Sequence, residues 1–522
     1  MFKKKGIRII CCLLILTFVL AGCGNNSNST PGSDEGGSAP SNGGVKREDL
    51  IFALAAEPTS LDPKGSNDTV SFRVMNQVFD TLVKTDSDGT IVPGLAEEWK
   101  VSEDNTEITF KIREGVKFHN GDVMTVDDVV YSVNKAIKSN FTKRTTNTMK
   151  EAVKIDDSTV KLILNQPYGP ALKCMATISM GIVNKRAMEE NPDGFARNPI
   201  GTGPYKFVEW KTGEKLVFER FDDYYRGAAS IKDLTFKILT DQNTGVIALE
   251  NGEVDVLETF PKSARKSLIE NENISFYETE SGLYYHISFN NEKGIFSNKK
   301  LRQAVSYAVD RESLIIGAFE GAAVPVECPI PPSCFGYVED FKGNEFNPDK
   351  ARELLAEAGY PDGLTVTMKT LESASYTIPT EIIQAQLREV GINAEIEIME
   401  RGAFLSEVYD ENDYEISLVN IVVPVTDADF AVFGRLHSSM KGSGNNIQRC
   451  DIPELDELIM KGRSTQDEAE RKEYYEQITE IVKEEAILIP LLTDMSAIAA
   501  NKDLKGVEPS AVSYYFVYNY SW

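Results

Sequence analysis

The segment from residue 45 to residue 522 alternates between strand and helix patterns over more length than one hydrophobic core supports. Polar and apolar residues alternate, as in half-buried strands, at residues 108–112, 160–164, 364–368 and 394–398. Apolar residues recur at helical spacing within residues 126–137, 301–309, 348–358 and 380–390. Because single cores stop growing beyond roughly 250–300 residues, we expect an α/β protein of two or three domains.

Several of these helices carry start or stop signals. Thr125 and Asp128 have the spacing of a capping box, and Asn347 directly precedes a first-turn proline. A further helix is expected from Thr380 to Val390, where Gly391 ends it. Two arginines, Arg302 and Arg311, flank the apolar stripe of residues 301–309 and are expected at the surface or in pairs between domains.

The charge and the motif content exclude several classes of function. A formal charge of −25 repels nucleic acid, so no DNA or RNA binding is expected. The three histidines lie far apart and no Cys-x-x-Cys pair occurs, so we expect neither a metal site nor a cofactor. Cys328 and Cys334 are close enough in sequence to permit a small disulfide. Known phosphate-loop, dinucleotide, zinc-protease and nucleophile-elbow motifs are missing from the sequence, which indicates a protein that is not an enzyme.

The first residues have the pattern of a secretory signal. Basic residues 3–5 and 8 precede an apolar run that begins at Ile9 and ends in Leu20-Ala-Gly-Cys23. This ending resembles a bacterial lipobox, which implies cleavage after residues 1–22 and acylation of Cys23. Residues 23–44, which include that cysteine, continue as a stretch rich in Gly, Ser, Asn and Pro, so we expect a flexible linker. The lipid anchor is then the expected attachment to the membrane, since no second apolar run is long enough to span it.

Six blocks of the chain, in order, resemble the peptide/nickel-type family 5 solute-binding proteins of ABC importers. They are Glu57–Pro63, Val92–Trp99, Phe110–Tyr131, Gly201–Gly227, Leu301–Arg311 and Ala351–Gly363. Any one block is weak evidence, whereas six blocks in order over nearly the whole chain are specific.

The resemblance implies a periplasmic-binding-protein type 2 fold, with two lobes, three domains and a hinged cleft that closes around ligand. Domain I would combine residues 45–86, 201–285 and 496–522. Domain II would be residues 87–200 and domain III residues 286–495. The two crossings between lobes, near residues 285–290 and 490–496, would be the hinges.

The resemblance also implies where ligand binds. Peptide-binding relatives usually have a Gly-Trp pair, then an Asp that holds the ligand's α-ammonium group, then an Asp-Pro-Asp step. Here Ile421 replaces the Trp, Pro424 falls where the ammonium-binding Asp is expected, and Asp427 and Asp429 stand for the last step. Either Asp427 or Asp429 takes over, the register differs, or the cargo is not an ordinary peptide.

The expected ligand contacts therefore come from loops of all three domains. Residues 420–435 of domain III contribute most, with help from residues 57–68 and 140–148. Arg401 is a candidate for binding an anionic group of the ligand, and an exposed surface position is the alternative. The individual residues expected to contact ligand are Thr59, Ser60, Arg401, Asn420, Ile421, Val425, Thr426, Asp427 and Asp429.

We expect a monomeric protein that captures a di- or oligopeptide and presents it to an ABC permease and its ATPase. Its expected location is the extracytoplasmic face of the membrane, at a Gram-positive cell surface or in a Gram-negative periplasm. Two alternatives stay open. One is a non-peptide cargo such as an amino-acid derivative, an opine or an oligosaccharide, and the other is a surface receptor without a transport role.

Overall fold

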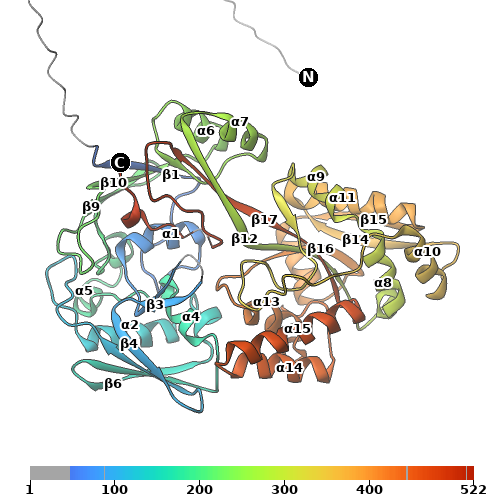
Figure 1. The fold of residues 1–522 in the computed structure, drawn as a ribbon, viewed down its shortest axis with the longest axis horizontal. Helices are drawn as coiled ribbons and strands as arrows, with labels where there is room; N and C mark the ends of the chain where they lie inside the picture. The colour runs from blue at the N-terminus through green and yellow to red at the C-terminus, as the bar shows by residue number, and fades with distance from the viewer. Residues whose placement is uncertain (1–46, 87–88, 443–444, 513) are drawn as a thin grey trace, which may run out of the picture. The chain divides into compact units, whose positions relative to one another are not determined.

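The computed structural model describes residues 47–522 apart from 87–88, 443–444 and 513 (Figure 1). The predicted signal segment, Cys23 and the linker lie outside the described residues. None of the described helices is both long and apolar enough to cross a bilayer. Within the described part, strands and helices alternate as the sequence patterns predict.

One large mixed sheet runs through the described residues. Its strands follow the order β15 (Ile392–Met399), β14 (Leu364–Leu371), β16 (Ile416–Val422), β12 (Ile274–Phe289), β17 (Leu488–Asn501), β11 (Val256–Leu257), β1 (Asp49–Leu54), β10 (Asp233–Ile238), β9 (Lys215–Arg220) and β8 (Tyr205–Lys211). A short strand, β13 (Ala323–Pro325), pairs with β17 off this path.

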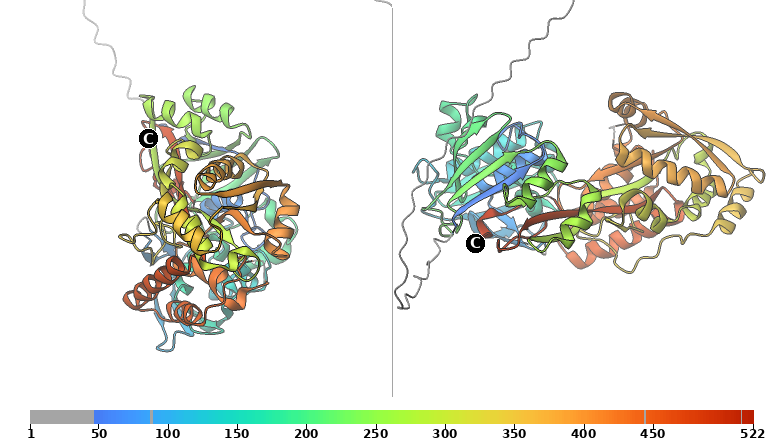
Figure 2. Two further views of the ribbon diagram at one scale, coloured as in Figure 1. Left: turned by 90° about the vertical axis from the view of Figure 1, so that its right-hand side faces the viewer. Right: turned by 90° about the horizontal axis from the view of Figure 1, so that it is seen from above.

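The two longest strands, β12 and β17, lie in the middle of that order. They pair antiparallel from Ile274↔Asn501 to Ser288↔Leu488, with register shifts near Glu280/Tyr284 and Tyr285/His286. Figures 1 and 2 show β12 and β17 side by side, with helices to either side of them. The same pair of strands therefore takes part in the packing of both halves of the sheet.

Two smaller sheets lie apart from the large one. The four-stranded sheet has the order β4 (Ala96–Val101), β5 (Glu107–Ile112), β7 (Thr159–Leu164) and β6 (Met149–Asp156). A hairpin pairs β2 (Val83–Thr85) with β3 (Ile91–Pro93). Helix α2 (Val126–Lys138) packs its apolar face into the same core as the four-stranded sheet.

The remaining helices cover the sheets. Those of the first half of the chain are α1 (Thr69–Val78), α3 (Lys143–Thr146), α4 (Ala171–Met175), α5 (Lys185–Glu190), α6 (Gln242–Glu250) and α7 (Arg265–Glu270). Those of the second half are α8 (Lys299–Ala308), α9 (Arg311–Phe319), α10 (Pro348–Glu357), α11 (Ala374–Glu389), α12 (Arg401–Phe404), α13 (Ala428–Leu436), α14 (Pro453–Ser464) and α15 (Glu468–Glu485).

Local signals predicted several elements correctly. The capping box of α2 forms, because the Thr125 hydroxyl accepts from the Asp128 backbone and the Asp128 carboxylate accepts from the Thr125 backbone. Asn347 caps α10 as expected. The predicted start of the helix at Thr380 is wrong, because α11 begins at Ala374 and includes Pro379. The ring of Tyr376 packs against the rings of Tyr285 and Phe404, at centroid distances of 6.1 and 6.4 Å. This packing stabilises the first turns of α11.

The prediction that Arg302 and Arg311 lie at the surface or in interdomain pairs is also wrong. Both are buried, at 5% and 8% exposure. Arg302 donates to the carbonyl oxygen of Ala486 at 3.0 Å, and Arg311 donates to that of Pro490 at 2.9 Å. Each guanidinium therefore satisfies backbone acceptors around the start of β17, where several carbonyl groups converge.

Candidate functional site

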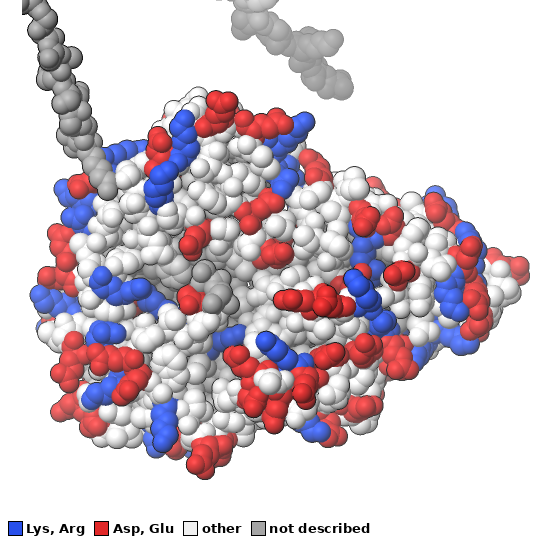
Figure 3. All heavy atoms as spheres, in the orientation of Figure 1, with Lys and Arg blue, Asp and Glu red and all other residues white. Residues whose placement is uncertain are grey.

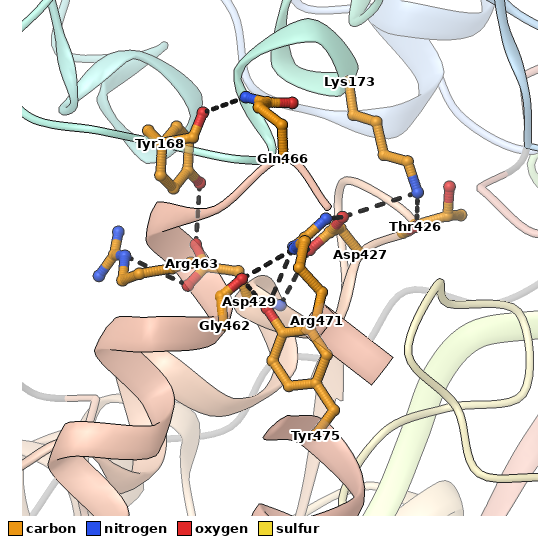
Figure 4. Close-up of polar contacts among 10 residues, drawn as sticks. All are labelled: Tyr168, Lys173, Thr426, Asp427, Asp429, Gly462, Arg463, Gln466, Arg471 and Tyr475. Carbon is orange, nitrogen blue, oxygen red and sulfur yellow. Dashed lines mark hydrogen bonds and ion pairs between the residues drawn. The ribbon is translucent and has the colours of Figure 1, made fainter. Parts of the chain in front are cut away.

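A buried acid–base network occupies the loop between β16 and α13. Asp427 is the N-cap of α13, and its carboxylate receives two hydrogen bonds from Arg471, at 2.6 and 3.0 Å (Figure 4). The Nζ atom of Lys173, on α4, lies 3.6 Å from the same carboxylate and donates to the Thr426 carbonyl oxygen at 3.1 Å. Asp427 is fully buried.

Asp429 completes the network from the first turn of α13. The Tyr168 hydroxyl donates to its carboxylate at 2.9 Å, and Arg463 Nε lies 3.4 Å from the other oxygen. Burial raises the pKa of Asp429, and the positive charge of Arg463 partly opposes that rise. We call these six residues the acid–base network: Tyr168, Lys173, Asp427, Asp429, Arg463 and Arg471.

The network joins two parts of the chain that are distant in sequence. Tyr168 and Lys173 come from the segment that follows β7, whereas its other members come from residues 427–471. A backbone contact reinforces the junction, since Gly169 N donates to the Arg463 carbonyl oxygen at 2.7 Å. A side chain at position 169 would meet the Thr465 carbonyl at 2.4 Å, so the close approach requires glycine there.

A second set of charged side chains comes from α3, α12 and α13. We call Arg144 (α3), Arg401 (α12) and Arg435 (α13) the arginine group. Among the residues that the structure describes, no carboxylate forms an ion pair with any of the three. The guanidinium of Arg144 donates to the Val422 carbonyl oxygen at 2.8 Å, which brings α3 against the end of β16.

The members of the arginine group differ in solvation, because Arg435 is partly buried whereas Arg144 and Arg401 are exposed. Burial lowers the pKa of Arg435 to about 10, and the nearby positive charge of Arg144 acts in the same direction. Burial also lowers the pKa of Arg144, although its side chain keeps contact with water. An unpaired guanidinium that stays charged at neutral pH in a partly buried position is stabilised by any anion that enters.

Aromatic side chains gather at α12. The rings of Tyr376 and Tyr409 lie 6.4 and 6.2 Å from that of Phe404, the last residue of α12. Burial raises the pKa of Tyr409, while the charges of Arg435 and Arg401 oppose the rise. Neutral phenol groups are therefore available beside the guanidinium groups as hydrogen-bond donors.

A cavity of about 670 Å³ is lined by part of the loop between β16 and α13. Its walls include Pro424, Val425 and Thr426, together with Lys173 and Tyr514. Both lobes expected from the sequence contribute to it, because residues 76–92 and 424–426 face one space. Its charged lining residues carry both signs, among them Lys84, Arg226 and Glu508.

The predicted contact residues fall into separate places. Thr59 and Ser60 lie at the start of α1, where the Thr59 hydroxyl donates to the Asp68 carboxylate at 2.5 Å. Asn420 pairs with Tyr285 in the sheet register. Ile421 is 5% exposed and packs in the core beneath α13. Of the nine predicted residues, Val425 and Thr426 line the cavity, and Arg401 belongs to the arginine group.

The described residues contain neither a disulfide nor a metal-binding group. Cys174, Cys328, Cys334 and Cys450 are free and buried, so the disulfide that residues 328 and 334 would permit is not formed in the structure. In the described ranges, no three side chains of His, Cys, Asp or Glu gather as a metal-binding group.

The chain matches the family model described as bacterial extracellular solute-binding proteins, family 5, over residues 90–443. The glutathione-binding protein GsiB of Escherichia coli (strain K12) is 30% identical over 475 residues, covering 88% of this chain and 91% of GsiB. The protein belongs to family 5 of the bacterial extracellular solute-binding proteins. The resemblance stated from the six sequence blocks is thereby confirmed.

Solved structures support the fold of this family 5 protein. HbpA2 from Haemophilus parasuis superposes with a TM-score of 0.84 at 27% identity, covering 91% of this chain and 99% of HbpA2. DppA from Helicobacter pylori, solved with the peptide STSA, gives a TM-score of 0.74 at 26% identity, covering 91% and 98%. The predicted two-lobed α/β fold class is confirmed.

In this family 5 member, the loop that differs from the peptide-binding pattern offers no free acid. Pro424 stands where the sequence resemblance predicts an ammonium-binding Asp, and both carboxylates of residues 420–429 already bind side chains of the acid–base network. Sequence reasoning included Arg144 and Arg435 only as members of longer ranges. The sequence carries no signal that these two arginines lack acidic partners, because the partners are set by the tertiary fold.

Proposed function

We propose that this protein is the ligand-capturing component of an ABC importer, and that its cargo is a small peptide that carries an anionic group. The observation that carries the proposal is the arginine group: Arg144 contacts the end of β16, and none of the three guanidinium groups has a carboxylate partner among the described residues. Guanidinium groups bind carboxylates through paired, charge-assisted hydrogen bonds.

The names of related proteins support a peptide cargo. GsiB is named for glutathione, and the structure of DppA holds a peptide. Glutathione is itself a small peptide with free carboxylates, which suits a site built from arginines. Capture in a hinged cleft would give the permease a shape that exists mainly when ligand is bound.

The first experiment identifies the bound solute. The full chain is extracted from membranes in mild detergent, examined by native mass spectrometry, and its released ligand is fragmented. We expect one or more small acidic peptides. Recovery of a sugar, or of a cationic peptide, would contradict the proposed cargo, and a chain that binds no solute under any condition would contradict the role as a binding protein.

We also propose that Cys23 carries the acyl chains that hold the protein at the extracytoplasmic face of the cell membrane. The Leu20-Ala-Gly-Cys23 sequence supports this proposal. In cells, Cys23→Ser should move the protein from the membrane fraction to the soluble fraction and abolish labelling by radioactive palmitate. Unchanged fractionation and labelling would contradict the anchor.

A non-peptide acid, such as an opine or another amino-acid derivative, is the second candidate cargo. The observation that favours it is Pro424, which stands where peptide-binding relatives usually have the ammonium-binding Asp. Fragmentation of the released ligand decides between the two, because a peptide yields amino-acid fragments and an opine yields a secondary-amine diacid.

A further inference from the structure

The acid–base network crosses from one predicted lobe to the other. Tyr168 and Lys173 belong to the predicted domain II, whereas Asp427 and Asp429 belong to the predicted domain III. The Tyr168 hydroxyl donates to Asp429 at 2.9 Å, and Lys173 Nζ lies 3.6 Å from the carboxylate of Asp427. These contacts join side chains that lie more than 250 residues apart in sequence.

Backbone groups and apolar packing extend this junction. Gly169 N donates to the Arg463 carbonyl oxygen at 2.7 Å, and the side-chain amide of Gln466 donates to the Tyr168 carbonyl oxygen at 3.2 Å. Val425, which is 4% exposed, packs in the same buried cluster as the four-stranded sheet. The two predicted lobes therefore share a buried contact as well as the two strands β12 and β17.

The junction can open without leaving a buried charge unpaired. Asp427 receives two hydrogen bonds from Arg471, and Asp429 lies 3.4 Å from Arg463, so both carboxylates keep a cationic partner on their own side. The side chain of Lys173 is already 15% exposed and gains water when the sides separate. Because an unpaired buried charge is the costly outcome, this division of partners favours a reversible contact.

The junction forms part of the wall of the cavity of about 670 Å³. Lys173 and Thr426 both line this cavity, and the Lys173 ammonium donates to the Thr426 carbonyl oxygen at 3.1 Å. Thr279 on β12, a strand that contains one of the predicted hinges, lines the cavity as well. A rotation that moves the lobes apart therefore lengthens the bond between Lys173 and Thr426.

We propose that the acid–base network is a reversible latch that holds the two lobes together beside this cavity, with Lys173 and Tyr168 as positioning residues. The inference rests on the proposed function and on the predicted lobes, and it names the contact that opens before cargo enters or leaves. Lys173 acts through Thr426 and Asp427, so it sets the position of the lobes without touching cargo.

Hydrogen exchange on the full chain, resolved to single amides by mass spectrometry, tests the latch without ligand. The Gly169 amide is the reporter, because its acceptor lies in the other lobe, and the Leu164 amide, which donates to Thr106 at 2.8 Å within one lobe, is the internal control. Lys173→Met should speed exchange at Gly169 by roughly 10- to 100-fold, as for the loss of one charged hydrogen bond, and leave Leu164 unchanged. Unchanged exchange at Gly169, or equal acceleration at both amides, would overturn the inference.

Three further variants assign the effect to the latch. Lys173→Arg keeps a cation beside the Thr426 carbonyl and should bring exchange at Gly169 back to within about threefold of wild type. Lys161→Met, which breaks an ion pair inside the four-stranded sheet, is the matched control and should leave Gly169 unchanged. If Lys173→Met does not fold, Gln466→Ala takes its place and should speed exchange at Gly169 by roughly 3- to 10-fold.

A distance measurement shows whether the lobes themselves separate. Spin labels are placed by Asp157→Cys and Asp349→Cys, whose native side chains are 98% and 95% exposed, and the native cysteines of the described residues are buried. Pulsed electron resonance should find a population at longer separation in Lys173→Met than in the chain with native Lys173. An unchanged distribution would contradict a role in lobe position.

The outcomes separate this inference from the proposed function. If exchange at Gly169 ignores Lys173→Met while a solute co-purifies with the chain, the latch is wrong and the role as a binding protein stands. If the latch responds as expected but no solute binds under any condition, the latch stands and the proposed function is wrong.

Discussion

The acid–base network and the arginine group both include residues of α13, yet their charges are paired differently. In the network, Asp427 and Asp429 have cationic partners at 2.6 and 3.4 Å, so the chain completes its own charge balance. In the arginine group, no carboxylate of the described residues pairs with the guanidinium groups. The comparison separates charges that the fold pairs internally from charges that it leaves without a carboxylate partner.

The distribution of charge on the surface does not show which charged side chains are paired by the fold and which lack a partner. Figure 3 shows acidic and basic side chains intermingled over the face seen in Figure 1. Exposed ion pairs, such as Lys154 with Asp157, contribute little because water screens them. The absence of an ion-pair partner is therefore informative only for a charged side chain that is buried away from this screening.

The largest effect should follow from breaking the network. Asp427→Ala leaves Arg471 buried without its partner, which should lower the free energy of unfolding by about 3–5 kcal/mol. Urea denaturation followed by circular dichroism measures this change. The control is Asp127→Ala, which removes an exposed carboxylate 3.7 Å from Lys154 and should cost less than about 1 kcal/mol. Similar losses for both variants would contradict the assigned structural role.

His119 adds to this comparison an ionisable side chain that the fold keeps neutral. Its Nε2 donates to the Gly203 carbonyl oxygen at 2.9 Å, and its Nδ1 accepts from Gly201 N at 3.4 Å. Burial lowers its pKa from 6.5 to about 4, so the unfolded chain binds the proton more tightly.

The stability due to neutral His119 should therefore be complete above pH 6.5 and be lost as the pH falls from 6.5 to 4. The loss is at most about 3 kcal/mol. Unfolding free energies of wild type and His119→Gln, measured across this range, should converge toward pH 4. Parallel curves would show that the histidine is not held neutral.

A smaller effect should follow from Tyr168→Phe. The change removes the hydroxyl that donates to Asp429 at 2.9 Å and leaves the ring in place. Loss of one hydrogen bond to a buried carboxylate should lower the free energy of unfolding by about 1.5–3 kcal/mol. Tyr360→Phe, at a half-buried position after α10, is the matched control and should change stability by less than about 0.5 kcal/mol.

The smallest effect on stability, and one of opposite sign, should follow from Arg435→Leu. Because Arg435 is partly buried without an acidic partner, replacing it removes an unfavourable charge and should leave unfolding unchanged or raise its free energy by up to about 1 kcal/mol. The same variant should lose the increase in melting temperature that ligand produces in wild type. A destabilisation like that of Asp427→Ala would place Arg435 with the structural charges instead.

Elements with local signals could be predicted from the sequence. The start of α2 depends on two side chains three residues apart, and β5 and β7 depend on simple alternation. The start of α11 could not be predicted, because packing of Tyr376 holds turns that precede Pro379. Arg302 was misplaced for a similar reason, since its carbonyl partners at residues 485–486 are distant in sequence.

In the candidate site, too, local sequence features could be predicted and tertiary pairings could not. A departure from the peptide-binding pattern at Pro424 is visible in one sequence, and Arg401 was singled out from its position before the loop. The pairing of Asp427 with Arg471, 44 residues away, is a product of the fold. Viewed in the sequence without that pairing, Asp427 has the appearance of a free carboxylate for an ammonium group, which is the role predicted for it.

The position of β17 has a consequence for how the chain can be made. This strand is formed by residues 488–501, yet it lies between β12 and β11 and connects the two parts of the large sheet. A chain that becomes available from its N-terminus onward therefore has two half-sheets with open edges until residues 488–501 can pair between them. A stop codon before residue 488 would remove a small fraction of the sequence and still leave the two half-sheets unjoined.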